Sequence, residues 1–175
     1  MKMRFSTIRG RFSALLLALG LLLGSGHAAR AQQGAAVQGL GPGIHPVLVV
    51  AGRTGSTVRM ELYLNRVDVP ALIGSYQGEI GYDTGALTLN RAELPRGITG
   101  AWNEVSPGRV RFAGITIQGV ASGPVLVLDF TARGPVAAEG FTLRMKEVAA
   151  AGDYANLAPR LVAREHPILS NTPAS

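Results

Sequence analysis

The sequence predicts an all-β fold, an antiparallel β-sandwich of about nine strands, and three observations lead to this prediction. In residues 72–82 apolar or small side chains alternate with polar ones, which is typical of a half-buried antiparallel strand. Short apolar runs recur along the chain and are separated by Gly, Pro, Asn and Asp. No window shows the sustained apolar spacing of an amphipathic helix. Two sheets, packed face to face, would bury the inward side chains.

The individual strands follow from alternation and from the turn residues between them. The second predicted strand places Val58, Met60 and Leu62 on one face, opposite Arg59 and Glu61. Several later runs alternate in the same way, and each is bounded by turn residues. The predicted strands span residues 46–51, 57–64, 72–82, 86–93, 98–103, 109–115, 125–132, 141–149 and 160–166.

The third predicted strand has the clearest two-sided pattern. The side chains predicted to point inward are Leu72, Gly74, Tyr76, Gly78, Ile80 and Tyr82, and those predicted to point outward are Ile73, Ser75, Gln77, Glu79 and Gly81. The strand is expected to end at Asp83, which begins a turn through Gly85. A carboxylate at this position accepts backbone N–H bonds within the turn, so we expect a structural role for Asp83 and not a catalytic one.

The N-terminus has the features of a secretory signal peptide over residues 1–31. Four basic residues precede an apolar run over residues 13–23, and a small-x-small pattern ends at Ala31. The apolar run is shorter than the roughly 20 residues that span a bilayer. The protein is therefore expected to be exported to the periplasm or the extracellular space after cleavage near Ala31, without membrane insertion. A flexible linker over 32–43, a sandwich domain over 44–170 and a disordered tail over 171–175 complete the predicted organisation.

The charge and cysteine content exclude two classes of protein. The whole chain has a formal net charge of +6, but five of its 17 basic residues lie in the predicted signal peptide, which has no acidic residue. The remaining charges nearly balance and the basic residues are dispersed, so nucleic acid is not expected as a partner. The chain contains no cysteine, so its stability must come from a hydrophobic core and not from disulfides.

The order of these elements resembles the cohesin family, whose members are bacterial β-sandwich modules that bind dockerins. The resemblance rests on the strand that ends in Tyr82 and Asp83, on the glycine-led run at 123–130, and on the run at 141–153 that ends in an acidic turn. It covers about 125 residues. It implies a jelly-roll-like cohesin topology and a non-catalytic, secreted module that recognises a dockerin-like partner in extracellular polysaccharide catabolism.

The resemblance also implies a partner-binding face. In cohesins the outer face of the sheet built from the third, fifth, sixth and eighth strands contacts dockerin. The basic bias of the corresponding residues departs from typical cohesin faces, and the same residues are equally compatible with the ordinary solvated side of a sheet. Carried over by position, the face comprises Ser75, Gln77, Glu79, Trp102, Arg109, Arg111, Arg144 and Lys146.

Two other functions remain open at this stage, namely a carbohydrate-binding module on the same fold and a structural or adhesion domain of a cell-envelope assembly. Polysaccharide binding needs a row of exposed aromatic rings, and the candidates are Tyr63, Trp102 and Tyr154. No metal site and no cofactor are expected, because His45 and His166 lack an adjacent carboxylate cluster. No nucleophile motif or carboxylate pair suggests an enzyme.

Overall fold

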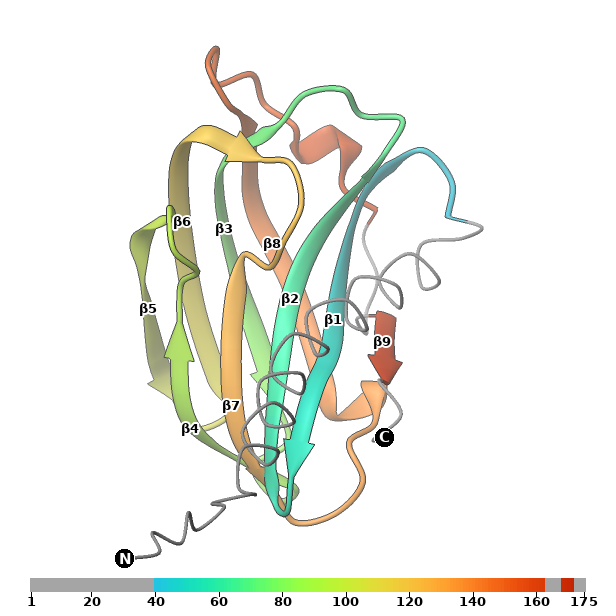
Figure 1. Ribbon diagram of the computed structural model, residues 1–175, viewed down its shortest axis with the longest axis vertical. Helices are drawn as coiled ribbons and strands as arrows, with labels where there is room; N and C mark the ends of the chain where they lie inside the picture. The colour runs from blue at the N-terminus through green and yellow to red at the C-terminus, as the bar shows by residue number, and fades with distance from the viewer. Residues whose placement is uncertain (1–39, 163–167, 172–175) are drawn as a thin grey trace, which may run out of the picture.

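The computed structural model describes residues 40–162 and 168–171, and these residues form a two-sheet β-sandwich (Figure 1). Two short 3-10 helices, η1 and η2, interrupt the strands. No helix in these two ranges is long and apolar enough to cross a membrane. The elements are β1 (Gly43–Thr54), β2 (Thr57–Val67), β3 (Ile73–Tyr82), β4 (Leu87–Glu93), β5 (Thr99–Ser106), β6 (Arg109–Val120), β7 (Leu126–Ala132), η1 (Ala138–Gly140), β8 (Phe141–Ala150), η2 (Ala158–Arg160) and β9 (Ile168–Asn171).

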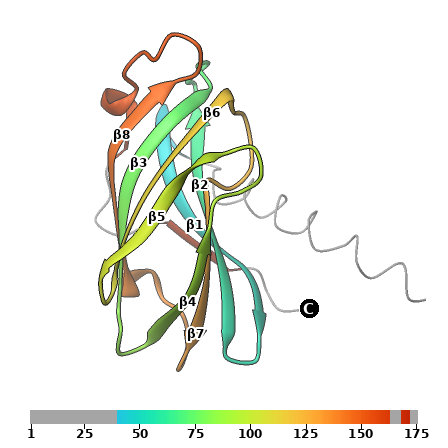
Figure 2. The same ribbon diagram turned by 90° about the vertical axis from the view of Figure 1, so that its left-hand side faces the viewer.

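The strands divide into a five-stranded and a four-stranded sheet. The five-stranded sheet has the order β4-β7-β2-β1-β9, and the four-stranded sheet has the order β5-β6-β3-β8 (Figures 1 and 2). Every strand pair is antiparallel except β1 and β9, which run parallel. The four-stranded sheet therefore contains the third, fifth, sixth and eighth strands, as the resemblance to cohesins implies.

The inward side chains of both sheets meet in one hydrophobic core. Val58, Met60 and Leu62 of β2 are fully buried, as the alternation predicts. They pack in the same cluster as Tyr76 and Ile80 of β3. Burial of a large apolar side chain contributes about 1.5–3 kcal/mol, so this contact between the sheets is the main source of stability in a chain without disulfides.

A buried hydrogen bond also links the two sheets. The Tyr76 hydroxyl on β3 donates to the Val125 carbonyl oxygen beside β7, at 2.6 Å. The Tyr76 ring lies against Gly114, where a side chain would come within 2.3 Å of the hydroxyl. Burial raises the pKa of Tyr76 well above its ordinary value, so this phenol stays protonated and continues to donate.

The start of β3 differs from the sequence prediction because the strand contains a β-bulge. The register with β8 shifts between Ile73 and Ser75, so that Gly74 is the extra residue of β3 in that pairing; the register with β6 is irregular at the same place, where residues 116–119 of β6 are unpaired. The shift turns Ile73 inward, where it is fully buried, although strict alternation placed it on the outer face. A side chain at Gly74 would meet the backbone of Ala151 at 2.6 Å, which explains why glycine occupies the bulge.

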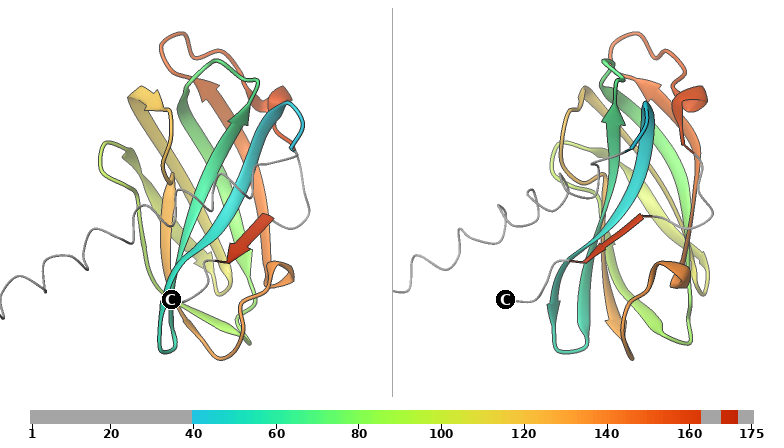
Figure 3. Two further views of the ribbon diagram at one scale, coloured as in Figure 1. Left: turned by 45° about the vertical axis from the view of Figure 1, so that its right-hand side comes forward. Right: turned by 90° about the vertical axis from the view of Figure 1, so that its right-hand side faces the viewer.

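The end of the chain also differs from the prediction. The closing strand was expected over residues 160–166, but residues 158–160 form η2. Pro159 explains the difference, since proline favours the first turn of a helix and cannot donate to a ladder. Leu161 forms an isolated parallel bridge with Ile44, and β9 pairs parallel to β1 further on (Figure 3), so the expected partner is right; residues 163–166 of the expected strand lie outside the described residues.

Two of the predicted domain boundaries can be compared with the ends of the strands. Gly43, the last residue of the expected linker, already belongs to β1, and Asn171, the first residue of the expected tail, ends β9. The predicted signal peptide, the linker up to residue 39 and the tail from residue 172 lie outside the described residues.

Candidate functional site on the outer face of the four-stranded sheet

The register of the four-stranded sheet gathers most of the predicted face residues on its outer side. Glu79 on β3 lies opposite Arg111 of β6 and Arg144 of β8. Residues directly opposite in antiparallel strands project to the same face. We call this side of the sheet the outer β5-β6-β3-β8 face. Seven of the eight predicted residues lie on it, namely Ser75, Gln77, Glu79, Arg109, Arg111, Arg144 and Lys146.

Lys146 reaches this face through a second β-bulge. The register between β3 and β8 shifts between Gln77 and Gly78, which leaves Lys146 as the extra residue of β8. Its Nζ lies 3.8 Å from Glu79 Oε2. Beyond the bulge Glu147 lies opposite Gln77 and joins the same face. The bulge therefore places two successive charged residues on one side of the sheet.

Glu79 is the centre of an ion network on this face. Its carboxylate accepts a hydrogen bond from Arg111 Nε at 3.1 Å, and Arg109 Nε lies 3.3 Å from its other oxygen. The hydrogen bond from Arg111 is the main reason that the pKa of Glu79 lies below its ordinary value, and the charges of Arg109 and Lys146 lower that pKa further. Glu79 therefore remains ionised at neutral pH and holds three cations around one carboxylate.

The face has more positive than negative charge. Four basic residues surround Glu79 and Glu147. Among the described residues Arg144 has no hydrogen-bond or ion-pair partner, and it is exposed. Arg109 and Arg111 each keep more than half of the side chain exposed although they contact Glu79. The face therefore presents unused guanidinium donors to whatever binds there.

Trp102 does not lie on this face, contrary to the prediction. On β5 it is directly opposite Phe112 of β6, which is buried in the core. Directly opposed residues share a face, so Trp102 points to the inner side of the sheet. Its neighbour Asn103 lies opposite Arg111 and is the β5 residue that projects outward there. Trp102 is 39 % exposed because β5 is the edge of the sheet.

Two exposed apolar residues extend the face and were not singled out in the sequence. Ile115 lies opposite Ser75 on the outer side and is 44 % exposed. Ile117, two residues further along β6, is 93 % exposed. The signal for Ile115 was present in the sequence, because alternation from Arg109 places it outward at the end of the predicted strand; Ile117 lies beyond that end, in the part of β6 whose pairing with β3 is irregular.

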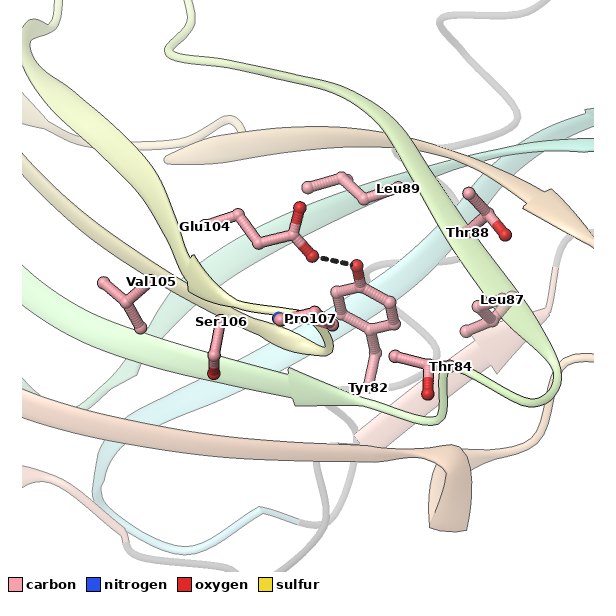
Figure 4. Close-up of a pocket in the computed structure, with 9 residues that line it drawn as sticks. All are labelled: Tyr82, Thr84, Leu87, Thr88, Leu89, Glu104, Val105, Ser106 and Pro107. Atoms are coloured by element: carbon pink, nitrogen blue, oxygen red, sulfur yellow. Dashed lines mark hydrogen bonds between the residues drawn. The ribbon is translucent and has the colours of Figure 1, made fainter.

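A cleft opens beside this face, between the edges of the two sheets. β4 and β5 are edge strands of different sheets, and residues of both line the cleft together with Tyr82 at the end of β3 (Figure 4). The Tyr82 ring packs edge-on against Phe130 at 5.0 Å, and its hydroxyl donates to Glu104 on β5. Burial and this hydrogen bond raise the pKa of Tyr82. The pair joins β5 to the core.

The remaining polar candidates have structural roles. Asp83 Oδ1 accepts a hydrogen bond from the Gly85 N–H at 2.8 Å, which is the predicted turn contact. The His45 imidazole is buried, and its Nε2 lies 2.7 Å from the Gly41 carbonyl oxygen. His166 lies outside the described residues. Within residues 40–162 and 168–171, no three potential metal-binding side chains lie close together.

The aromatic rings considered for polysaccharide binding do not form a platform. Tyr63 is buried on β2, opposite Val47 of β1 in the five-stranded sheet. Trp102 lies on the inner side of β5, and Tyr154 follows β8 with an exposed ring. The three rings therefore belong to three different parts of the molecule.

Comparisons with known proteins identify the fold. No family model matches the sequence, and no curated protein matches it. Solved cohesin structures do match. The sixth cohesin of scaffoldin B from Acetivibrio cellulolyticus, solved with a dockerin, has a TM-score of 0.53 at 12 % identity, with 74 % of this chain and 99 % of that chain covered.

Two further cohesins give similar values. A type I cohesin–dockerin complex from Clostridium thermocellum matches with a TM-score of 0.54 at 15 % identity, covering 74 % of this chain and 99 % of that one. A cohesin module from a family 33 glycoside hydrolase of Clostridium perfringens matches with a TM-score of 0.51 at 16 % identity, covering 75 % and 99 %. The described domain thus has a cohesin-like fold, and almost the whole of each cohesin is covered.

Proposed function

We propose that this protein is a non-catalytic binding module that recognises another protein through the outer β5-β6-β3-β8 face. The observation that carries the proposal is the arrangement around Glu79, where exposed cations crowd one carboxylate and Arg144 is left without a partner. The exposed Ile115, opposite Ser75, continues the same surface, and Ile117 is exposed two residues further along β6. A polar region with charge-assisted donors beside an apolar region is a combination that protein interfaces use.

The partner that this face fits is a dockerin-like module with an acidic surface. The cohesin-like fold supports the dockerin part of the proposal, since two of the matched cohesins were solved in dockerin complexes. The acidic part rests on charge alone. Carboxylates of a partner would pair with Arg144 and with the free donors of Arg109 and Arg111, because guanidinium groups bind carboxylates with two parallel hydrogen bonds.

The proposed setting is outside the cytoplasm. The N-terminal sequence supports export to the periplasm or the extracellular space, and the absence of cysteine is compatible with either. Extracellular polysaccharide catabolism is the setting that the resemblance to cohesins suggests. In that setting the module would hold a dockerin-bearing enzyme or structural protein in an assembly.

The test is an affinity capture with the exported protein as bait. The immobilised protein is exposed to the secreted proteins of its source organism and, separately, to a panel of recombinant dockerin modules. We expect a dockerin-bearing protein to be retained and identified by mass spectrometry, with a dissociation constant that isothermal titration calorimetry then measures. Failure to retain any dockerin-bearing protein in either format would contradict the proposed partner.

A pair of variants locates the contact. Ser75→Arg with Gln77→Arg places two long side chains in the middle of the proposed face, whereas Asn90→Arg places one on the exposed edge of β4. We expect the first variant to lose the captured protein and the control to retain it. Equal binding by both would show that a partner exists but docks elsewhere.

A further inference from the structure

The four edges of the two sheets are protected to different degrees. An unprotected edge strand offers free backbone N–H and C=O groups to another strand, so proteins usually cover, charge or bulge their edges. The edge of β4 carries Arg91 and Glu93 and has a register shift between Leu89 and Arg91. The edge of β8 is covered at one end, where the Leu157 N–H bonds to the Val148 carbonyl, and its middle carries the charged residues Arg144, Lys146 and Glu147. β9, at the remaining edge, has only four residues.

The edge of β5 lacks these protections over residues 99–103. In the four-stranded sheet β5 pairs with β6 and ends the strand order, and it runs across the front of the molecule in Figure 2. All eight of its residues are exposed. Residues 99–103 include no charged residue and no proline. The single register shift of β5 comes later, between Glu104 and Ser106.

Among the described residues, the exposed large apolar side chains lie mostly on β5 and on the strand next to it. Five large apolar side chains of the described residues are exposed, and four of them lie on the neighbouring strands β5 and β6. These four are Trp102, Val105, Ile115 and Ile117. Trp102 lies on the inner side of the sheet and Ile115 on the outer side, so what these side chains share is their place on or next to the edge strand β5.

We infer that the edge of β5 pairs with β5 of a second copy of this chain, in antiparallel orientation about a two-fold axis. The pairing would join two four-stranded sheets into one sheet of eight strands. It would use the backbone of residues 100–104, which are symmetric about Trp102, and would bring the two exposed Trp102 side chains together. It uses the edge of the strand, whereas the proposed partner face uses outward side chains of the whole sheet.

The sequence of β5 is complementary to itself in this arrangement. With the axis at Trp102, each Trp102 faces its copy on the inner side of the sheet. Ala101 then lies opposite Asn103 of the second copy, and Gly100 lies opposite Glu104 of the second copy. No like charges oppose one another. The small residues Ala101 and Gly100 lie opposite the longer polar residues Asn103 and Glu104. Cross-strand aromatic pairs and the absence of charge repulsion both favour such pairing.

The test is sedimentation equilibrium of the exported protein with two matched variants. Ala101→Lys with Asn103→Lys would place lysines opposite each other twice in the dimer, whereas Ala101→Lys with Asn103→Glu would place lysine opposite glutamate twice. Both variants change the same exposed, outward positions, and circular dichroism confirms that each is folded. We expect reversible dimers of the wild type, association at least about tenfold weaker in the first variant, and association at least as strong as wild type in the second.

A second signal follows from Trp102, which is the only tryptophan of the chain. We expect its emission to shift to shorter wavelength as the wild-type protein is concentrated, and to stay constant in the variant with two lysines. A monomer mass at all concentrations up to about 1 mM would overturn the inference. Equal association of both variants, or dimerisation without a change in tryptophan emission, would overturn it as well.

Discussion

The outer faces of the two sheets are built from the same kind of alternating strand, and their charge networks have opposite sign. On the five-stranded sheet Arg59 is surrounded by three carboxylates, those of Glu61, Glu93 and Asp129, at 3.2–3.8 Å. On the four-stranded sheet Glu79 is surrounded by three cations at 3.1–3.8 Å. The first face therefore has an excess of carboxylates and the second an excess of basic groups.

The apolar residues of the two faces differ as well. Outward residues of the five-stranded sheet include Val47, Val49 and Val127, and all three are buried. On the four-stranded sheet the outward Ile115 and Ile117 are exposed. An alternating sequence pattern therefore identifies the two faces of a strand but not which outward face is free to bind. Exposure and charge balance distinguish them, and both indicate the four-stranded sheet.

Reversing charge on one face at a time is expected to have the largest effect on binding. Arg111→Glu with Arg144→Glu removes the basic excess of the four-stranded face, so we expect it to weaken binding of the dockerin-like partner by about 100-fold. Arg59→Glu on the other face is the control and is expected to change binding less than about threefold. Surface plasmon resonance measures both. Equal losses would show that the difference between the two faces does not determine binding.

Removing the Tyr76 hydroxyl is expected to affect stability and not recognition. Tyr76→Phe leaves the buried Val125 carbonyl without this donor, so we expect the free energy of unfolding to fall by about 1–3 kcal/mol in urea denaturation. Partner affinity at 25 °C should stay within about twofold, because Tyr76 lies between the sheets. A large loss of affinity in this folded variant would mean that the core, and not the surface, limits binding.

The apolar end of the face is expected to contribute less than its charges. Ile117→Asp removes the most exposed large apolar side chain and adds a negative charge near an acidic partner. We expect a five- to tenfold weaker complex by calorimetry, about 1–1.4 kcal/mol. Tyr154→Asp, which also replaces an exposed apolar side chain but lies in the loop after β8, is the control that should leave binding unchanged.

Removing the charge of Glu79 is expected to have the smallest effect. It should lower the melting temperature by only a few degrees. Its pKa is lowered in the folded protein, so its ionised form stabilises the fold at neutral pH. That contribution is complete above the ordinary pKa of 4.5 and is lost as the pH falls through the lower folded value. Glu79→Gln should therefore melt about 2–4 °C below wild type at pH 7, and the two should converge as the pH falls below 4.5. A constant difference down to pH 2.5 would contradict this assignment.

The sequence predicts the fold well because buried strands show their inward face in their residues. Alternation in β2 and β3 identifies the core side chains, and the resemblance to cohesins predicts which strands share a sheet. The bulges at Gly74 and Lys146 were not predicted, since one inserted residue reverses the phase without changing the pattern nearby. Trp102 was assigned to the wrong face for a related reason: β5 is exposed on both faces, so no buried side fixes its phase.

Site-specific photo-crosslinking reports which face of the module the partner touches. A benzophenone amino acid at Ala113, in the middle of the outer β5-β6-β3-β8 face, is compared with the same group at Arg91 on the exposed side of the five-stranded sheet. We expect the captured partner to crosslink from position 113 and not from position 91. Crosslinking from position 91 alone would contradict it.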